Sequence, residues 1–200
     1  MSDIEPAGAD AAWVVLDTPL DPERLVNFCR DLERLYRINP YLEFRHWYNR
    51  DESRFDVAFR NLSNAREFEL QLTLDRRSEL EFVVYYDRGT KRHTRFQIEP
   101  GPVGSRLKIT DDYGAAAPGM AVDTGEVDRS LHAWGVALHE YLRREARWGR
   151  FAAWRWYMRR VWVPMKPAAR RITFIILMVT LAEIALIALV IAIYWAEHRN

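Results

Sequence analysis

Apolar and polar positions alternate with different periods along the chain, and each period predicts a different kind of element. A short apolar run at residues 11–17 predicts a strand. Asp21 and Pro22 then predict a helix start, because an aspartate cap and a proline in the first turn both favour initiation. We expect this helix to end at Asn39-Pro40. Its predicted buried face consists of Leu25, Phe28, Cys29, Leu32, Leu35 and Tyr36.

Six further runs are rich in β-forming residues and are separated by turn clusters such as Asp87-Arg88-Gly89. Phe55, Val57 and Phe59 alternate with polar residues, which indicates a sheet with one apolar and one solvated face. The predicted strands are residues 43–49, 54–62, 66–74, 80–86, 93–98 and 105–113.

A second, longer helix is predicted to begin at Val127, after a loop at residues 114–125. Its apolar stripe is expected to cover the sheet, and it consists of Leu131, Trp134, Leu138, Tyr141 and Leu142. The order strand, helix, six strands and long helix predicts an α+β domain.

This order over residues 9–150, together with Asn39-Pro40 and Trp134, resembles the START/Bet v 1-like superfamily, also called SRPBCC or polyketide cyclase-like. The resemblance implies a helix-grip antiparallel sheet of about seven strands wrapped around a long C-terminal helix. It also implies a hydrophobic pocket for lipids, sterols, quinones or polyketides. The candidate pocket residues are Tyr85, Tyr113, Trp134, Leu138 and Tyr141. The alternative is that these side chains belong to the core, as aromatic residues on apolar faces usually do.

Residues 172–195 form an apolar run that contains one ionisable side chain, Glu183. As a helix this run is about 36 Å long, which is enough to cross a bilayer with some tilt. Arg170 and Arg171 precede the run, and Tyr194 and Trp195 end it, as expected at the two membrane interfaces. We predict one transmembrane helix followed by a short tail at residues 196–200.

The formal net charge of +1 conceals an uneven distribution. Residues 1–142 carry 18 Lys/Arg and 25 Asp/Glu, whereas residues 143–171 carry 10 and 1. The positive-inside rule therefore predicts a cytoplasmic N-terminal domain on a single-pass, tail-anchored protein without a signal peptide. The chain has 26 Arg and 3 Lys, which is typical of a GC-rich bacterial genome and favours the cytoplasmic (inner) membrane.

Residues 147–171 combine arginine with aromatic rings and predict an amphipathic segment on the membrane surface. Basic residues beside a bilayer attract anionic lipid. The predicted contact residues are Trp154, Arg155, Arg159, Arg160, Trp162, Arg170 and Arg171. Arginine among aromatic residues also suits nucleic acid, but the neighbouring span argues against that partner.

Glu183 lies near the middle of the predicted span, where a carboxylate is costly unless it is protonated or has a partner. Thr180 and Ile187 share its face, and Ala188 contributes to a small-residue seam that lets helices approach closely. We predict a transmembrane protein partner or a homo-oligomer through this face. The alternative is a protonated glutamate in a lone anchor.

The sequence carries no convincing catalytic, metal or cofactor motif. His139-Glu140 resembles the start of a zinc-protease motif, but Arg143 stands where the second histidine is needed. Asp111-Asp112-Tyr113 suits either a cyclase-like pocket or a simple strand end. Cys29 is the single cysteine, so no intramolecular disulfide is expected.

Three functions follow from these patterns. The first is a membrane-tethered START-like module that binds a lipid, quinone or hopanoid-like molecule together with a membrane partner. The second is an accessory subunit of a membrane complex, and the third is a cyclase or aromatase. The predicted divisions are a disordered N-terminus (1–8), the START-like domain (9–146), a basic segment (147–171), the span (172–195) and the tail (196–200).

Overall fold

The computed structural model describes residues 11–114 and 124–198, so the predicted disordered N-terminus and most of the predicted loop lie outside the described residues. The chain divides into two compact units, Met1–Pro164 and Met165–Asn200. The first unit contains β1 (Ala11–Thr18), α1 (Pro22–Cys29), α2 (Leu32–Arg37), β2 (Leu42–Asn49), β3 (Arg54–Asn61), β4 (Glu67–Arg76), β5 (Glu81–Tyr86), β6 (His93–Gly101), β7 (Gly104–Asp112), α3 (Thr124–Trp148), α4 (Ala152–Tyr157) and η1 (Met158–Trp162).

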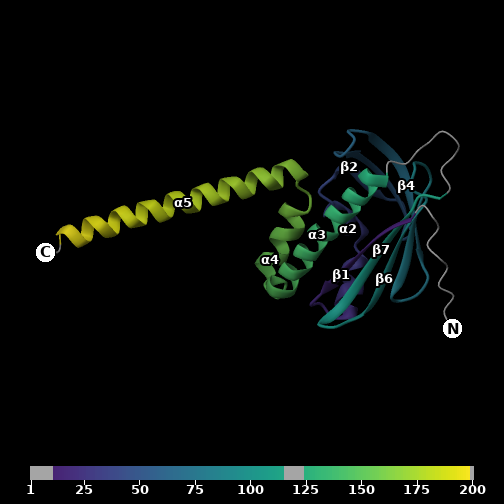
Figure 1. The fold of residues 1–200 in the computed structure, drawn as a ribbon, viewed down its shortest axis with the longest axis horizontal. Coiled ribbons are helices and arrows are strands. Elements are labelled where there is room, and N and C mark those ends of the chain that lie inside the picture. The colour runs from purple at the N-terminus through teal and green to yellow at the C-terminus, as the bar shows by residue number, and fades with distance from the viewer. Residues whose placement is uncertain (1–10, 115–123, 199–200) are drawn as a thin grey trace. The chain divides into compact units, whose positions relative to one another are not determined.

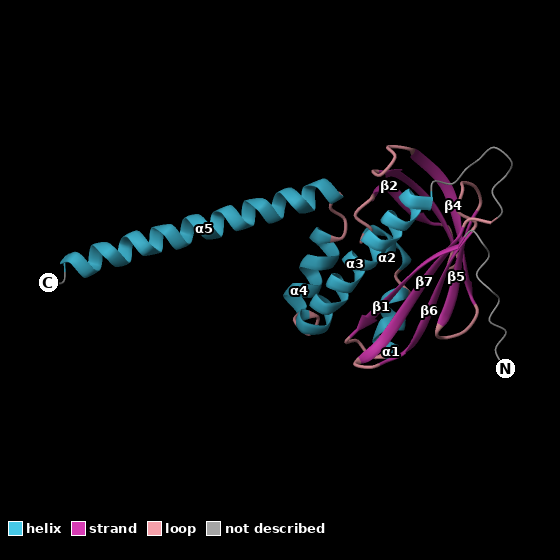
Figure 2. Cartoon of the chain, viewed as in Figure 1, coloured by secondary structure: helices cyan, strands magenta, loops and turns pink. Residues whose placement is uncertain are grey.

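The strands form one antiparallel sheet in the order β1-β7-β6-β5-β4-β3-β2. Strand β1 crosses to the far end of the meander and pairs with β7, from Ala11 opposite Asp112 to Thr18 opposite Ser105. Helix α3 and the pair α1–α2 lie on the same side of the curved sheet (Figures 1 and 2). The predicted helix-grip α+β fold with seven strands is therefore confirmed.

The core lies between this concave face and the helices. Alternate residues of each strand point into it, including the fully buried Phe96, Leu107 and Ile109. The opposite face carries ion pairs such as that of Arg106 with Asp17, together with exposed apolar residues such as Trp13 and Val15. Gly135 lets α3 approach β1 closely, because a Cβ at this position would lie 2.6 Å from Val14 Cγ2.

The sequence predicted one helix where the structure has two. Helix α1 begins after Asp21, whose side chain accepts a hydrogen bond from the Arg24 amide at 2.8 Å. A second cap ends this helix early, because Asp31 accepts from the Arg34 amide at 3.1 Å and starts α2. Aspartate favours such local caps over helix continuation, and periodicity alone does not detect the change of direction.

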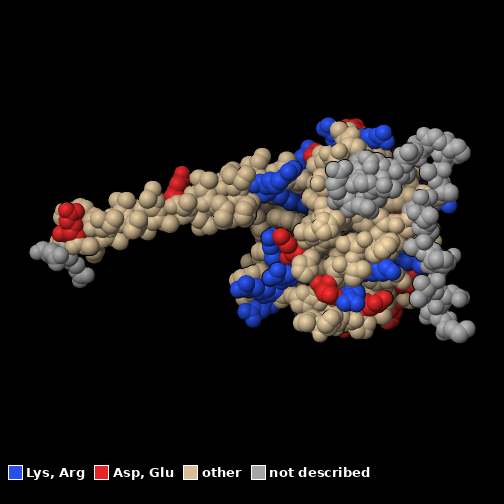
Figure 3. Space-filling model, viewed as in Figure 1, with Lys and Arg blue, Asp and Glu red and all other residues tan. Residues whose placement is uncertain are grey.

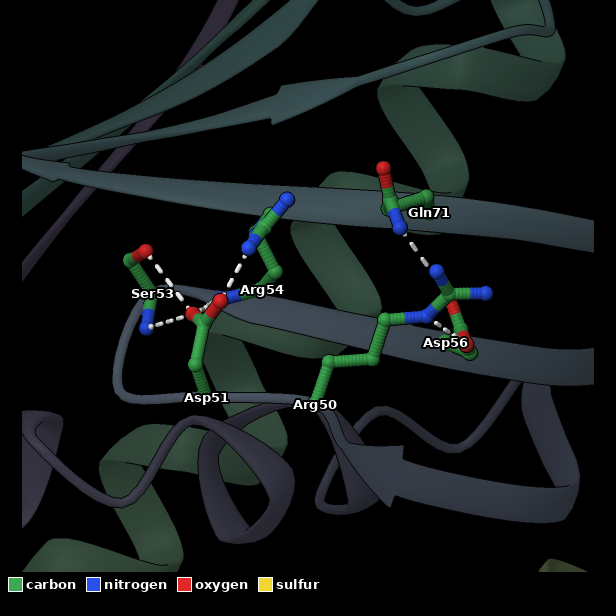
Figure 4. A network of polar contacts seen from close by, with 6 residues as sticks. All are labelled: Arg50, Asp51, Ser53, Arg54, Asp56 and Gln71. Carbon is green, nitrogen blue, oxygen red and sulfur yellow. Dashed lines mark hydrogen bonds and ion pairs between the residues drawn. The ribbon is translucent and has the colours of Figure 1, made fainter.

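The turn between β2 and β3 is held by two acidic residues (Figure 4). Asp51 Oδ1 accepts hydrogen bonds from the amides of Ser53 and Arg54, both at 2.8 Å. These bonds and the Arg54 guanidinium hold the pKa of Asp51 well below its usual value. Asp56 accepts hydrogen bonds from Arg50 and Gln71, which link the turn to β3 and β4.

The segment that follows α3 packs onto the domain. Met158 and Val163 are buried in the core, and Trp154 and Trp162 pack against it. Residues 147–163 are thus part of the first compact unit, although the sequence predicted a separate basic segment over 147–171. Trp154 and Trp162 are half-buried against the domain, so only part of each side chain is available for the predicted contact with the membrane surface.

Helix α5 spans Pro167–His198 and forms most of the second unit. It is the one helix among the described residues that is long and apolar enough to cross a membrane. None of the residues in its most apolar stretch is buried. It contains the predicted span at 172–195 and continues through His198 into the predicted tail.

Candidate functional site

A pocket of about 210 Å³ opens between the helical pair α1–α2 and the end of the β4–β5 hairpin. Its walls are mainly apolar side chains from the core face: Val26, Leu32, Leu74, Phe82 and Ile98. Four exposed polar residues lie at its rim: Arg30, Arg76, Ser78 and Glu79. The pocket therefore combines an apolar interior with a polar, positively charged mouth.

The local fold explains this arrangement. Helix α1 stops at Cys29, so Arg30 lies in the short connection to α2, where its guanidinium donates to Asn27 Oδ1 at 3.1 Å. Strand β4 ends at Arg76, and the turn that follows carries Ser78 and Glu79. The α1–α2 connection and the β4–β5 turn thus bring polar residues to the edge of an apolar surface.

Cys29 contributes a buried wall of this pocket. Burial raises the pKa of its thiol to about 12. The reactive form of cysteine is the thiolate, so this side chain remains a protonated, apolar thiol at neutral pH. Cys29 therefore supplies packing rather than a nucleophile.

A stack of aromatic rings closes the pocket on its inner side. Phe82 stacks on Phe96 with 4.6 Å between ring centroids, and Phe96 meets Trp134 edge-on at 6.0 Å. The Trp134 indole donates to the Leu35 carbonyl at 3.1 Å, which fixes α3 to α2. Trp134 and the fully buried Leu138 are core residues that lie behind the pocket, and neither lines it.

A chain of buried hydroxyl groups lies at the other end of the concave face. Tyr36 and Tyr86 hydroxyls are 2.6 Å apart, and the Tyr86 hydroxyl lies 2.9 Å from Thr94 Oγ1. Thr94 donates to Asp111 Oδ1 at 2.6 Å, and Lys91 donates to Asp111 Oδ2 at 2.6 Å. Asp111 is 2% exposed and Thr94 is fully buried. The series of hydroxyl groups therefore ends at a buried carboxylate, which is ion-paired with Lys91.

Asp111 is the final acceptor in this series of hydrogen bonds, and it determines which hydroxyl group donates at each step. Thr94 uses its single proton on Asp111, so it accepts from Tyr86, which in turn accepts from Tyr36. Burial, together with the negative charge of Asp111, raises the pKa of both tyrosines. Both tyrosine hydroxyls stay protonated. The hydroxyl groups of Tyr36, Tyr86 and Thr94 each donate to the next group in the series that ends at the Asp111 carboxylate. This arrangement stabilises the ends of β5, β6 and β7.

Tyr141 belongs to a third cluster, in which α3 meets α2. Its hydroxyl accepts hydrogen bonds from Arg34 Nε at 2.9 Å and Arg34 Nη2 at 2.6 Å. Arg34 also lies over the Phe28 ring and forms an ion pair with Glu145 at 3.3 Å. The guanidinium of the buried Arg34 is therefore hydrogen-bonded to Tyr141 and ion-paired with Glu145. Tyr141 is a structural hydrogen-bond acceptor for this arginine.

The remaining two predicted pocket residues also lie away from the pocket. Tyr85 lies on the outer face of the sheet, where its hydroxyl accepts from Arg77 at 3.0 Å and its ring contacts His93. Tyr113 follows β7 and donates to Asp111 Oδ2 at 3.4 Å. None of the five predicted residues is therefore among those that line the pocket between α1–α2 and the β4–β5 hairpin.

The residues that do line the pocket were missed because most of them are ordinary aliphatic side chains. The one usable signal was the cluster Arg76-Arg77-Ser78-Glu79 beside the apolar strand. Within residues 11–114 and 124–198, no group of three or more His, Cys, Asp or Glu side chains is arranged to hold a metal ion.

Comparison with known proteins identifies the fold. No protein-family model matches the chain, and no curated protein matches it. Among solved structures, it is similar to a START superfamily protein from Mycobacterium smegmatis, at 15% identity and a TM-score of 0.53, covering 66% of this chain and 96% of that one. It is also similar to a protein from Thermus thermophilus (16% identity, 66% and 95% covered, TM-score 0.52). A third is a protein from Deinococcus radiodurans (13% identity, 70% and 98% covered, TM-score 0.50).

Proposed function

We propose that this chain, whose first unit has the START/Bet v 1-like fold, is a membrane-anchored binding protein for a small amphipathic lipid. The ligand has a hydrocarbon chain that enters the pocket between α1 and the β4–β5 hairpin. Its polar head is anionic and lies at Arg30 and Arg76. The observation that carries the proposal is the apolar pocket with two arginines at its mouth.

The size of the pocket narrows the class of ligand. Pockets for drug-sized ligands span about 300–1,000 Å³. A pocket of about 210 Å³ suits the end of an acyl chain or a single ring, and it is too small for a whole polycyclic molecule such as a hopanoid. Among the ligands that the sequence left open, the size of the pocket therefore leaves an acyl chain or a single quinone ring, and the charge of the rim decides between them.

The rim selects the head group. Arg30 and Arg76 outnumber the single carboxylate of Glu79, so the mouth favours a negatively charged head. Both arginines are exposed, and exposed charge pairs contribute about 0.2–1 kcal/mol each. The apolar walls supply most of the affinity, and the rim supplies the preference for an anion.

Helix α5 supplies the location. A membrane-spanning helix keeps the domain beside the bilayer, where acyl chains are abundant. We place the domain on the cytoplasmic side of a bacterial inner membrane, because basic residues precede the span.

The pocket favours binding over catalysis. Its buried thiol is protonated, and its other polar groups are exposed at the rim. A cyclase or aromatase would need an acid or base within reach of a bound substrate.

The test is calorimetric titration of decanoate and decanol into the full chain in nanodiscs, with empty nanodiscs subtracted. Decanoate is expected to bind at one site per chain. Val26→Trp, which fills the pocket from α1, is expected to abolish that binding. Arg30→Gln and Arg76→Gln are each expected to weaken decanoate about 1.4- to 5-fold and to leave decanol unchanged. Arg24→Gln, elsewhere on α1, is the matched control.

Two outcomes would overturn the proposal. Unchanged decanoate binding by Val26→Trp would show that the pocket is not the site. Binding of a short-chain quinone at one site, without binding of decanoate, would assign the pocket to a ring instead of an acyl chain.

A second candidate function is that of an accessory subunit, and one observation favours it. Glu183 lies near the middle of the apolar stretch of α5, where an unpaired carboxylate is costly. A partner helix on the face of Thr180, Ile187 and Ala188 would remove this cost. Glu183→Leu is expected to abolish co-purification of a membrane partner or self-association, while Glu183→Gln retains part of it. Unchanged association in Glu183→Leu would contradict this role.

A further inference from the structure

Large aromatic side chains are exposed in one short segment of the first unit. Trp156 is 63% exposed and Phe151 is 43% exposed, and Trp148 and Tyr157 are exposed beside them. Trp148 lies between Phe151 and Trp154, with ring centroids 5.9 and 6.4 Å away. Apolar groups clustered in this way usually mark a surface that meets a partner.

Arginines surround these rings. Arg147 lies over Trp148 and Arg150 lies over Phe151, at 5.1 and 4.7 Å from the ring centroids. Blue side chains gather over α4 in Figure 3. We call this surface the arginine–aromatic patch; it consists of Arg147, Trp148, Arg150, Phe151, Arg155, Trp156, Tyr157, Arg159 and Arg160. The sequence has no Asp or Glu between Glu145 and Glu183, so every charged residue within the patch is an arginine.

The segment cannot turn these rings inward, because its opposite face is already packed. Met158 and Val163 are buried in the core. Trp162 packs on Tyr141 with 5.5 Å between ring centroids. Arg155 Nη1 donates to the carbonyls of Gly149 and Arg150, which fixes the turn between α3 and α4. The exposed rings are therefore held outward by a segment whose opposite face packs on the domain.

We propose that the arginine–aromatic patch rests on the surface of an anionic bilayer and holds the domain against it. Tryptophan and tyrosine favour the membrane–water interface, and basic side chains favour anionic lipid head groups. Six residues separate Arg160 from Pro167, where α5 begins. The two residues therefore lie within about 25 Å of each other, as chain length requires. The proposal depends on α5 being in a membrane and is independent of any ligand in the pocket.

The experiment places an environment-sensitive fluorophore at single cysteines of the full chain in a Cys29→Ser background. Trp156→Cys reports on the patch. Val103→Cys, 80% exposed in the β6–β7 turn, reports on a surface of the domain outside the patch, and Leu181→Cys reports on α5. Each labelled chain is placed in nanodiscs of phosphatidylcholine alone or with about a third phosphatidylglycerol. The neutral quencher acrylamide measures how accessible each label is to water.

At position 156, quenching is expected to fall severalfold in the anionic nanodiscs compared with the neutral ones. Position 103 is expected to be quenched equally in both, and position 181 to be protected in both. High salt is expected to restore quenching at 156, because exposed charges are screened. The double variant Arg159→Gln and Arg160→Gln is expected to restore it at low salt. Unchanged near-ultraviolet circular dichroism checks that this variant folds.

Equal quenching at 156 in neutral and anionic nanodiscs would overturn the proposal. Protection of 156 in native membranes but not in anionic nanodiscs would also overturn it, and would assign the patch to an acidic protein. Exposure of 181 to the quencher would instead contradict the membrane span itself, so the two failures are distinguishable.

Discussion

Thr94→Val tests whether the buried polar chain stabilises the sheet in the way that its geometry indicates. The substitution keeps the shape of the side chain and removes one hydroxyl, which donates to Asp111 at 2.6 Å and accepts from Tyr86. A hydrogen bond to a charged group contributes about 1.5–3 kcal/mol, and a neutral one about 0.5–1.5 kcal/mol. Because Thr94 is fully buried, water cannot replace either bond. We expect a loss of about 2–4 kcal/mol in the free energy of unfolding.

The assay is urea unfolding of the full chain in mild detergent, followed by tryptophan fluorescence. A loss of this size is expected to lower the urea midpoint by about 1–2 M. Thr73→Val, at an exposed position of β4, is the matched control and is expected to change stability by less than about 0.5 kcal/mol. Combining Thr94→Val with Asp111→Asn is expected to give less than the sum of the two effects, since both act on one bond. A Thr94→Val variant as stable as Thr73→Val would refute the reasoning.

Three further predictions concern other groups. Cys29, with its thiol pKa raised to about 12, is expected to resist iodoacetamide at pH 8 until the domain unfolds; rapid labelling of the folded chain, measured by mass spectrometry, would contradict its burial. The pKa of Asp51 is lowered from 3.8 in the folded state, so its contribution is present above that value and is lost as the pH falls below it; Asp51→Asn is expected to flatten the decline of the urea midpoint between about pH 5 and 2. Tyr141→Phe removes the acceptor for Arg34 and is expected to cost about 1.5–3 kcal/mol, whereas the exposed Tyr157→Phe is expected to cost little; equal urea midpoints for these two variants would refute that role.

Much of the fold was predictable because its signals are local. Alternation such as Phe55, Val57 and Phe59 identified the strands, and the stripe from Leu131 to Leu142 identified α3. Each of these patterns reflects which side chains the core buries. The order of the elements then carried the family resemblance that implied the helix-grip architecture. The apolar run in α5 was equally clear from composition.

The site was not predictable to the same degree, because a pocket forms where elements that are distant in sequence meet. Val26, Leu74 and Ile98 look like any other core residues until α1 stops at Cys29 and leaves a gap beside them. Trp134 was predicted to line a pocket, but it does not line this one, and its indole hydrogen bond to Leu35 could not be foreseen from the sequence. Helical periodicity identified an apolar face at Trp154 and Trp162 but gave no sign that the domain covers it.

The central claim is that an acyl chain enters the pocket between α1 and the β4–β5 hairpin. Its most direct test is photocrosslinking in native membranes with a fatty acid that carries a diazirine near the end of its chain, followed by peptide mapping. The proposal predicts adducts on peptides that contain α1–α2 and the β4–β5 hairpin, and predicts their loss in Val26→Trp. Adducts confined to α5, or unchanged by Val26→Trp, would contradict it.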